Sequence, residues 1–97
     1  MLFLVASLLL AQGSWVDQLQ NQKRETCCFN SDGRRLDDPE WRTKDNTYEV
    51  LFVEGWVKVP PEAVVQMPNK DGVVRVWSNK QMGEPRYIRC FLPGSLG

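Results

Sequence analysis

The sequence of 97 residues contains no histidine. This absence excludes Ser-His-Asp and Cys-His catalysis, the usual haem ligand and most zinc sites. Basic and acidic side chains are equally numerous, 12 of each, so the formal net charge is zero and gives no electrostatic basis for binding nucleic acid. The sequence also lacks a Cys-x-x-Cys pair and a glycine-rich loop that could cradle a phosphate. We therefore expect no catalytic residue, no metal, no cofactor and no nucleic-acid partner.

The sequence has no apolar run long enough to span a bilayer, which needs roughly 20 residues. Residues 1–10 are nearly all apolar, and Ala11 and Gly13 occupy the −3 and −1 positions of a signal-peptidase site before Ser14. No lysine or arginine precedes this run, so a buried N-terminal helix or strand is the alternative interpretation. We expect a signal peptide over residues 1–13, one small domain over residues 14–97, periplasmic or secreted localisation, and no stable membrane insertion after cleavage.

Cysteine is scarce, with three residues in the chain, and its number is odd. A mature domain of about 84 residues is near the size at which a hydrophobic core alone is marginal, so a covalent link would be useful. A disulfide from Cys27 or Cys28 to Cys90 would close a loop of about 62 residues and stabilise the fold by roughly 4 kcal/mol. Such a bond fits an exported protein. One thiol is then left over.

Residues 48–60 are rich in β-branched and aromatic side chains and predict two strands joined at Glu54-Gly55, where Gly55 can adopt a positive φ. In that register Val53 faces Trp56, and Val50 faces Val59. One face of this hairpin is nearly all apolar and is the expected core face: Tyr48, Val50, Phe52, Val57 and Val59.

Further strands are expected over residues 34–36, 73–77 and 86–92, and residues 40–43 could pair with the central hairpin across a turn at 44–46. Turns are expected at 30–33 and at Asp71-Gly72, and residues 62–65 form either a helical turn or a short edge strand. Ser14 is a helix N-cap, and Trp15, Gln18 and Leu19 follow at helical spacing. The expected fold is all-β, small and mainly antiparallel: a five-stranded β-roll or SH3-like barrel with a short N-terminal helix.

Strand alternation favours Cys28 over Cys27 as the partner of Cys90. Neighbouring residues of a strand point to opposite faces, so only one of the two adjacent cysteines can meet Cys90. In an alternating strand over residues 86–92, Ile88, Cys90 and Leu92 share the inward face. We expect the bond Cys28–Cys90, with Cys27 as the alternative partner; Cys27 would then be free or available for a dimer.

The order of several short motifs resembles a family of small, uncharacterised exported proteins of Alphaproteobacteria, rhizobial relatives especially. The motifs are Ser14-Trp15-x-Asp17-Gln18-Leu19, Cys27-Cys28-x-x-Ser31-Asp32, Gly55-Trp56-Val57-x-Val59-Pro60, Asp71-Gly72 and Ile88-x-Cys90-Phe91-x-Pro93-Gly94. Members often carry two further cysteines, at positions that hold Gly33 and Trp77 here. Their joint absence is what a disulfide between those two positions would produce, and it leaves Cys27 or Cys28 for Cys90. The resemblance implies a fold, a compartment and a disulfide pattern, but no activity.

Tryptophan is abundant for so small a chain, with four residues. Trp41, Trp56 and Trp77 could form a flat patch that stacks on sugars or holds a peptide. The alternative is that these large side chains fill the core of a small domain. The sequence thus favours a non-catalytic module that binds an unidentified protein or envelope component; a redox or enzymatic protein using the spare thiol is the alternative.

Overall fold

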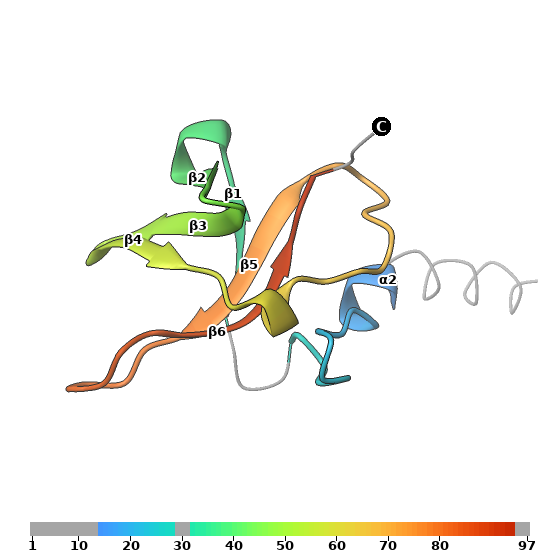
Figure 1. Ribbon diagram of the computed structural model, residues 1–97. Helices are drawn as coiled ribbons and strands as arrows, with labels where there is room; N and C mark the ends of the chain where they lie inside the picture. The colour runs from blue at the N-terminus through green and yellow to red at the C-terminus, as the bar shows by residue number, and fades with distance from the viewer. Residues whose placement is uncertain (1–13, 29–31, 95–97) are drawn as a thin grey trace, which may run out of the picture.

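The computed structural model describes residues 14–28 and 32–94, and Figure 1 shows the order of its elements. The helical elements are each about one turn long: α2 (Ser14–Asp17), η1 (Asp38–Glu40) and η2 (Pro61–Ala63). The strands are β1 (Asp32–Leu36), β2 (Trp41–Lys44), β3 (Thr47–Phe52), β4 (Gly55–Lys58), β5 (Val74–Asn79) and β6 (Tyr87–Leu92). Within the described ranges, no helix has the length and apolar character needed to cross a membrane. The predicted signal peptide, residues 1–13, lies outside these ranges.

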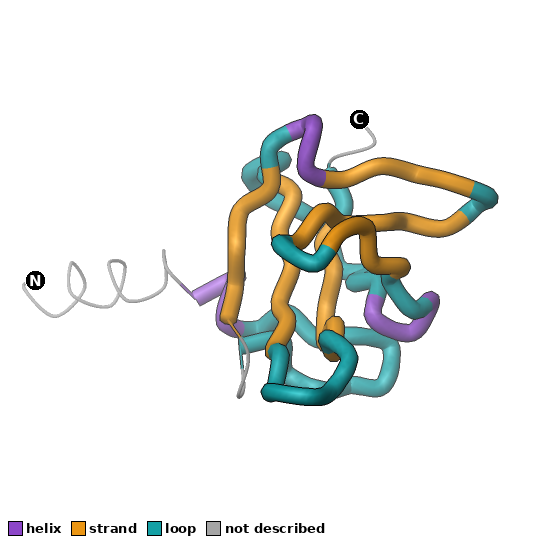
Figure 2. Tube along the Cα trace, turned by 90° about the vertical axis from the view of Figure 1, so that its left-hand side faces the viewer, coloured by secondary structure: helices purple, strands orange, loops and turns teal. Residues whose placement is uncertain are grey.

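The strands form two antiparallel sheets of three strands each. The strand orders are β1-β5-β6 and β2-β3-β4. Figure 2 shows the strands as two groups, one upright and one running across the view. The expected small, mainly antiparallel β domain with a short N-terminal helix is confirmed. The expected count of five strands is wrong, because residues 41–44 form a full strand of the second sheet.

Two turns decide how the sheet β2-β3-β4 is built. The turn between β2 and β3 lies at Asp45-Asn46, as expected, and both residues have positive φ, 52° and 65°. Aspartate and asparagine tolerate this conformation, which the twist of a tight hairpin favours. The predicted tip of the next hairpin is wrong by one residue: Phe52 pairs with Gly55, so Val53 and Glu54 form the loop.

The correction leaves the predicted faces unchanged. Val50 pairs with Val57 rather than with Val59, which is a slip of two residues. Because side chains alternate with a period of two, such a slip keeps every side chain on its original face. Val50 and Val59 are buried, and the other members of the predicted core face pack against the same cluster: Tyr48, Phe52 and Val57.

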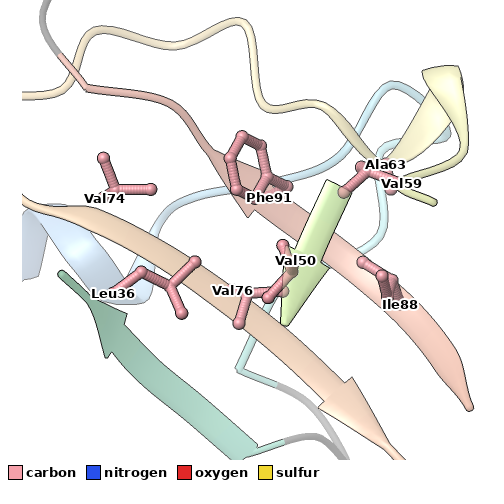
Figure 3. Close-up of a cluster of buried hydrophobic side chains, with 8 residues drawn as sticks. All are labelled: Leu36, Val50, Val59, Ala63, Val74, Val76, Ile88 and Phe91. Carbon is pink, nitrogen blue, oxygen red and sulfur yellow. The ribbon is translucent and has the colours of Figure 1, made fainter. Parts of the chain in front are cut away.

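The main core lies between the two sheets. It consists of eight buried residues drawn in Figure 3: Leu36, Val50, Val59, Ala63, Val74, Val76, Ile88 and Phe91. Residues 61–65 close one side of this core. They contain both a helical turn and a short strand-like pairing, the two alternatives expected for residues 62–65. The η2 turn is followed by a single parallel bridge from Val64 to Phe91, and the Val65 N–H donates to the Phe91 carbonyl at 2.8 Å.

A β-bulge in β6 reverses the predicted alternation. The register with β5 shifts between Ile88 and Cys90, so Arg89 is the extra residue. Ile88 therefore joins Phe91 in the main core, whereas Cys90 and Leu92 point to the opposite face of the sheet. The prediction that Ile88, Cys90 and Leu92 share one face is wrong for this reason.

The opposite face of the sheet β1-β5-β6 is covered by the N-terminal segment, residues 15–28. Its contacts form a second cluster of six buried residues: Leu19, Cys27, Val65, Trp77, Cys90 and Leu92. Asn21 fastens this segment, because its Nδ2 donates to the carbonyl of the bulged Arg89 at 2.9 Å. Its Oδ1 accepts the N–H groups of Lys23 and Glu25. One buried amide therefore holds both the N-terminal turn and the bulge in place.

Candidate functional site

The disulfide joins Cys27 to Cys90, with a Cα–Cα distance of 5.5 Å. The prediction that Cys28 bonds to Cys90 is therefore wrong, and Cys27, the alternative partner, forms the bond. Both adjacent cysteines lie in a turn and not in a strand, so strand alternation does not apply to them. The N–H of Cys27 donates to the carbonyl of Leu19, which places Cys27 in the second cluster, and the bulge turns Cys90 to the same face.

The remaining cysteine, Cys28, is exposed. Its Sγ lies 4.0 Å from Oδ1 of Asp17, a weak contact to a carboxylate. Cys27 has no exposed surface and is part of the intramolecular bond, so a disulfide-linked dimer would have to use Cys28 rather than Cys27.

The three tryptophans expected to bind do not form one patch. Trp41 packs in the main core, where its ring lies 6.2 Å from that of Tyr48 and 6.1 Å from that of Phe91. Trp77 is 3% exposed in the second cluster, on the other side of the sheet β1-β5-β6. Trp56 alone of the three is exposed, at 38%. Core packing therefore accounts for Trp41 and Trp77, and Trp56 is the surface candidate.

The position of Trp77 explains why the residue opposite it in β1 is a glycine. Gly33 in β1 is the direct cross-strand partner of Trp77. A Cβ added to Gly33 would lie 2.7 Å from Nε1 of the indole, closer than van der Waals contact allows. The indole thus occupies the space over Gly33, and the two positions at which the resemblance implied cysteines face each other across the ladder.

Trp56 lies in an ordered group on the exposed face of the sheet β2-β3-β4. We call this surface the outer face and define it by Arg42, Glu49, Leu51, Trp56 and Lys58, which the strand register places side by side. The Arg42 guanidinium stacks 3.9 Å from the Trp56 ring centroid, and its Nε donates to Oε1 of Glu49 at 2.7 Å. Glu49 is 6% exposed beneath this arginine. The cation is therefore held between a buried carboxylate and an aromatic ring, and it fixes the orientation of Trp56.

A concave surface lies between the hairpins β3-β4 and β5-β6, whose tips project to the same side of the molecule in Figure 1. We call it the hairpin cleft. It has a volume of about 470 Å³ and is lined by seven residues: Arg34, Phe52, Val53, Ser78, Asn79, Lys80 and Arg86. Arg86 joins the two hairpins through a bidentate pair with Glu54, at 2.6 and 3.0 Å. The hydrogen bond from Arg86 lowers the pKa of Glu54 to about 2.

Three carboxyl groups of the described residues have a pKa below its ordinary value, and each is lowered by a hydrogen bond from a neighbouring side chain. Hydrogen bonds from arginine side chains lower the pKa of Glu54 and of Asp71 to about 2, and one from Asn21 lowers the pKa of Glu25. A general acid at neutral pH requires the opposite shift. Across residues 14–28 and 32–94, no three cysteine, aspartate or glutamate side chains lie close enough together to hold a metal ion.

Sequence reasoning missed most of these surface residues. The alternation of side chains in β3 could have placed Glu49 on the outer face. It could not have predicted that Arg42 covers Glu49, because Arg42 lies on another strand. The pair of Glu54 and Arg86 spans 32 positions and has no local signal. Comparisons of the chain with protein-family models, curated proteins and solved structures find no match.

Proposed function

We propose that the chain is a small exported domain, stabilised by its disulfide, that serves as a non-catalytic binding or structural module of the periplasm or cell envelope. The disulfide supports the compartment, since such bonds persist mainly in oxidising environments. We also propose an SH3-like arrangement of the strands. It is supported by the main core between the two sheets and by the bridge from Val64 to Phe91 that brings the chain from one sheet to the other.

The proposed binding of another protein rests on the outer face. Trp56 and its cross-strand neighbour Leu51 are each more than one third exposed, and Arg42 holds the indole in one orientation. Tryptophan and arginine are the residues most enriched at the centres of protein interfaces, where a rigid side chain loses little entropy on binding. We infer that Trp56 is the anchor of the contact with an envelope protein.

The resemblance to the alphaproteobacterial family stays part of the proposal. It is supported by the direct pairing of Gly33 with Trp77, because residues that are cross-strand partners can be replaced together by a disulfide. The pairing of Cys27 with Cys90 supports the rest of the implied disulfide pattern.

Export and binding are tested separately. The intact mass of protein recovered from the periplasm or medium should begin at Ser14, whereas full-length protein in the cytoplasm would contradict export. For binding, tagged wild-type protein, Trp56→Ala and Tyr87→Ala are crosslinked in envelope extracts. Tyr87 is an equally exposed aromatic residue, at 42%, on the other sheet. A partner that is lost only with Trp56→Ala supports the proposal, and identical partners for all three proteins contradict it.

A redox function of Cys28 is the second candidate, supported by the exposure of its thiol. It predicts that the native, oxidised protein reduces a disulfide or peroxide substrate when an external thiol is added as the reductant, which returns oxidised Cys28 to the thiol, and that Cys28→Ser abolishes this turnover. Equal rates for the two proteins, or no rate above that of free cysteine, would contradict it. Titration without denaturant should find one reactive thiol per chain.

A further inference from the structure

The hairpin cleft gathers three cationic side chains from different parts of the chain. Arg34 comes from β1, Lys80 follows β5, and Arg86 precedes β6. Both guanidinium groups pack on the ring of Phe52, Arg86 at 4.1 Å and Arg34 at 5.2 Å from its centroid. Like charges repel one another, so other contacts must hold these groups in the same cleft.

Each cation in the cleft is fixed by its own anchor. Arg86 is held by Glu54 and by Oγ of Ser78, to which its Nη1 donates at 3.1 Å. The two nitrogens of Arg34 donate to the Leu51 carbonyl at 2.8 Å and to Glu40 at 3.4 Å.

Lys80 is anchored differently from the two arginines. Its ammonium donates to the backbone carbonyls of Gln81 and Glu84 in its own loop. These contacts orient the charge of Lys80 but do not neutralise it. A lysine held in this way keeps its charge available to a ligand.

The charges of the cleft do not cancel. Arg34 and Arg86 are each paired with one carboxylate, but Lys80 takes part in none of the ion pairs formed within the described residues. The cleft therefore carries one positive charge in excess, although the chain as a whole is neutral. The contacts described above use three of the five N–H donors of Arg86 and two of the five of Arg34, so donors remain for a ligand.

We propose that the hairpin cleft binds a carboxylate that carries an adjacent apolar group. A single excess charge fits a monoanion, and the planar guanidinium groups suit the oxygens of a carboxylate. Phe52 supplies an apolar floor, and Val53, which is 96% exposed, supplies an apolar rim beside the charges. The volume is in the range of small-ligand sites. The C-terminus of a peptide and a free organic acid are two sources of this chemistry.

This site is independent of the proposed contact at Trp56, because Phe52 and Trp56 belong to opposite faces of their hairpin. The test uses the oxidised full chain, labelled with ¹⁵N, and N-acetylphenylalanine as the probe. Its neutral counterpart, N-acetylphenylalaninamide, has the same shape without the charge. We expect saturable amide shifts at Val53 and Lys80 with the acid, and binding of the amide that is weaker by about tenfold or more.

Lys80→Gln is the decisive variant, because Lys80 is exposed and its replacement leaves the anchors of both arginines intact. We expect it to weaken binding of the acid by about tenfold, whereas Lys70→Gln, an exposed lysine outside the cleft, should not change it. Binding should also weaken with increasing salt. A tetrapeptide Ala-Ala-Ala-Phe that binds more tightly than N-acetylphenylalanine identifies a peptide C-terminus as the source, and equal affinity identifies a free acid.

Several results would overturn the proposal. One is an absence of shifts at about 10 mM probe, a concentration at which even weak ligands of this size bind. Equal binding of the acid and the amide would show that charge is irrelevant. Equal binding of acetate or inorganic phosphate would show an unselective cationic surface. Unchanged affinity in Lys80→Gln would show that the excess charge does not hold the ligand.

Discussion

The adjacent cysteines offer a direct test of the architecture, because one is bonded and fully buried and the other is exposed. The perturbation is Cys27→Ala in a Cys28→Ser background, which removes the disulfide and prevents Cys28 from replacing Cys27. The single variant Cys28→Ser, which keeps the disulfide, is the matched control. The two proteins differ only in the bond and in the small side chain that forms it.

The expected loss follows from the position of the bond in the chain. Cys27 and Cys90 are 63 positions apart, and closing a loop of this length in the unfolded chain is worth about 4 kcal/mol in the chain-entropy model. The Cys27 side chain is also completely buried in the second cluster, so its truncation should add about 1 kcal/mol of lost packing. The free energy of unfolding should fall by roughly 4–5 kcal/mol, a large part of the 5–15 kcal/mol typical of a domain. Cys28→Ser should change it by less than about 0.5 kcal/mol.

The assay is urea unfolding of wild type, the single variant and the double variant, without reductant, followed by tryptophan fluorescence. Trp77 lies in the same cluster as the disulfide, so its environment reports loosening of the N-terminal segment. Adding reductant to Cys28→Ser should reproduce most of the loss seen in the double variant, because reduction breaks the bond but keeps the Cys27 side chain. Free energies of the double and single variants within about 1 kcal/mol of each other would refute the reasoning. A loss of several kcal/mol in Cys28→Ser would instead identify Cys28 as the bonded residue.

Three further predictions concern the turns and pairs of the fold. Gly55→Val should lower the free energy of unfolding by about 1–3 kcal/mol in urea titrations, because Gly55 has a φ of 117° that a β-branched residue resists; an unchanged midpoint would contradict the hairpin geometry. Gly33→Ala should cost about 1–3 kcal/mol through its clash with the Trp77 indole, and a loss that persists in a Trp77→Phe background would show that the indole is not the cause. The hydrogen bond from Arg75 lowers the pKa of Asp71 from its ordinary 3.8 to about 2, so the stabilisation by this pair is present above pH 4 and is lost as the pH falls toward 2. The difference in urea midpoint between wild type and Asp71→Asn should therefore shrink between pH 5 and pH 2, and a constant difference would contradict the pairing.

The sequence alone determined those features that depend on neighbouring residues. Asp45-Asn46 marked a tight turn because these side chains tolerate positive φ. The alternation of apolar side chains assigned the core face of β3 and β4 correctly even though the register was wrong. A period of two is unaffected by a slip of two residues, so the faces were better determined than the pairing.

Only the tertiary structure decided the features that join distant residues. The carbonyl of Arg89, the bulged residue, accepts a hydrogen bond from the side chain of Asn21, 68 positions away. That bulge turns Cys90 away from Ile88 and so selects Cys27 as its partner. The hairpin cleft likewise forms where the hairpins β3-β4 and β5-β6 come together. The residues within each hairpin do not indicate which other hairpin it will contact. Local conformation is set by each residue and its neighbours, whereas these contacts are set by how the two sheets and the N-terminal segment pack together.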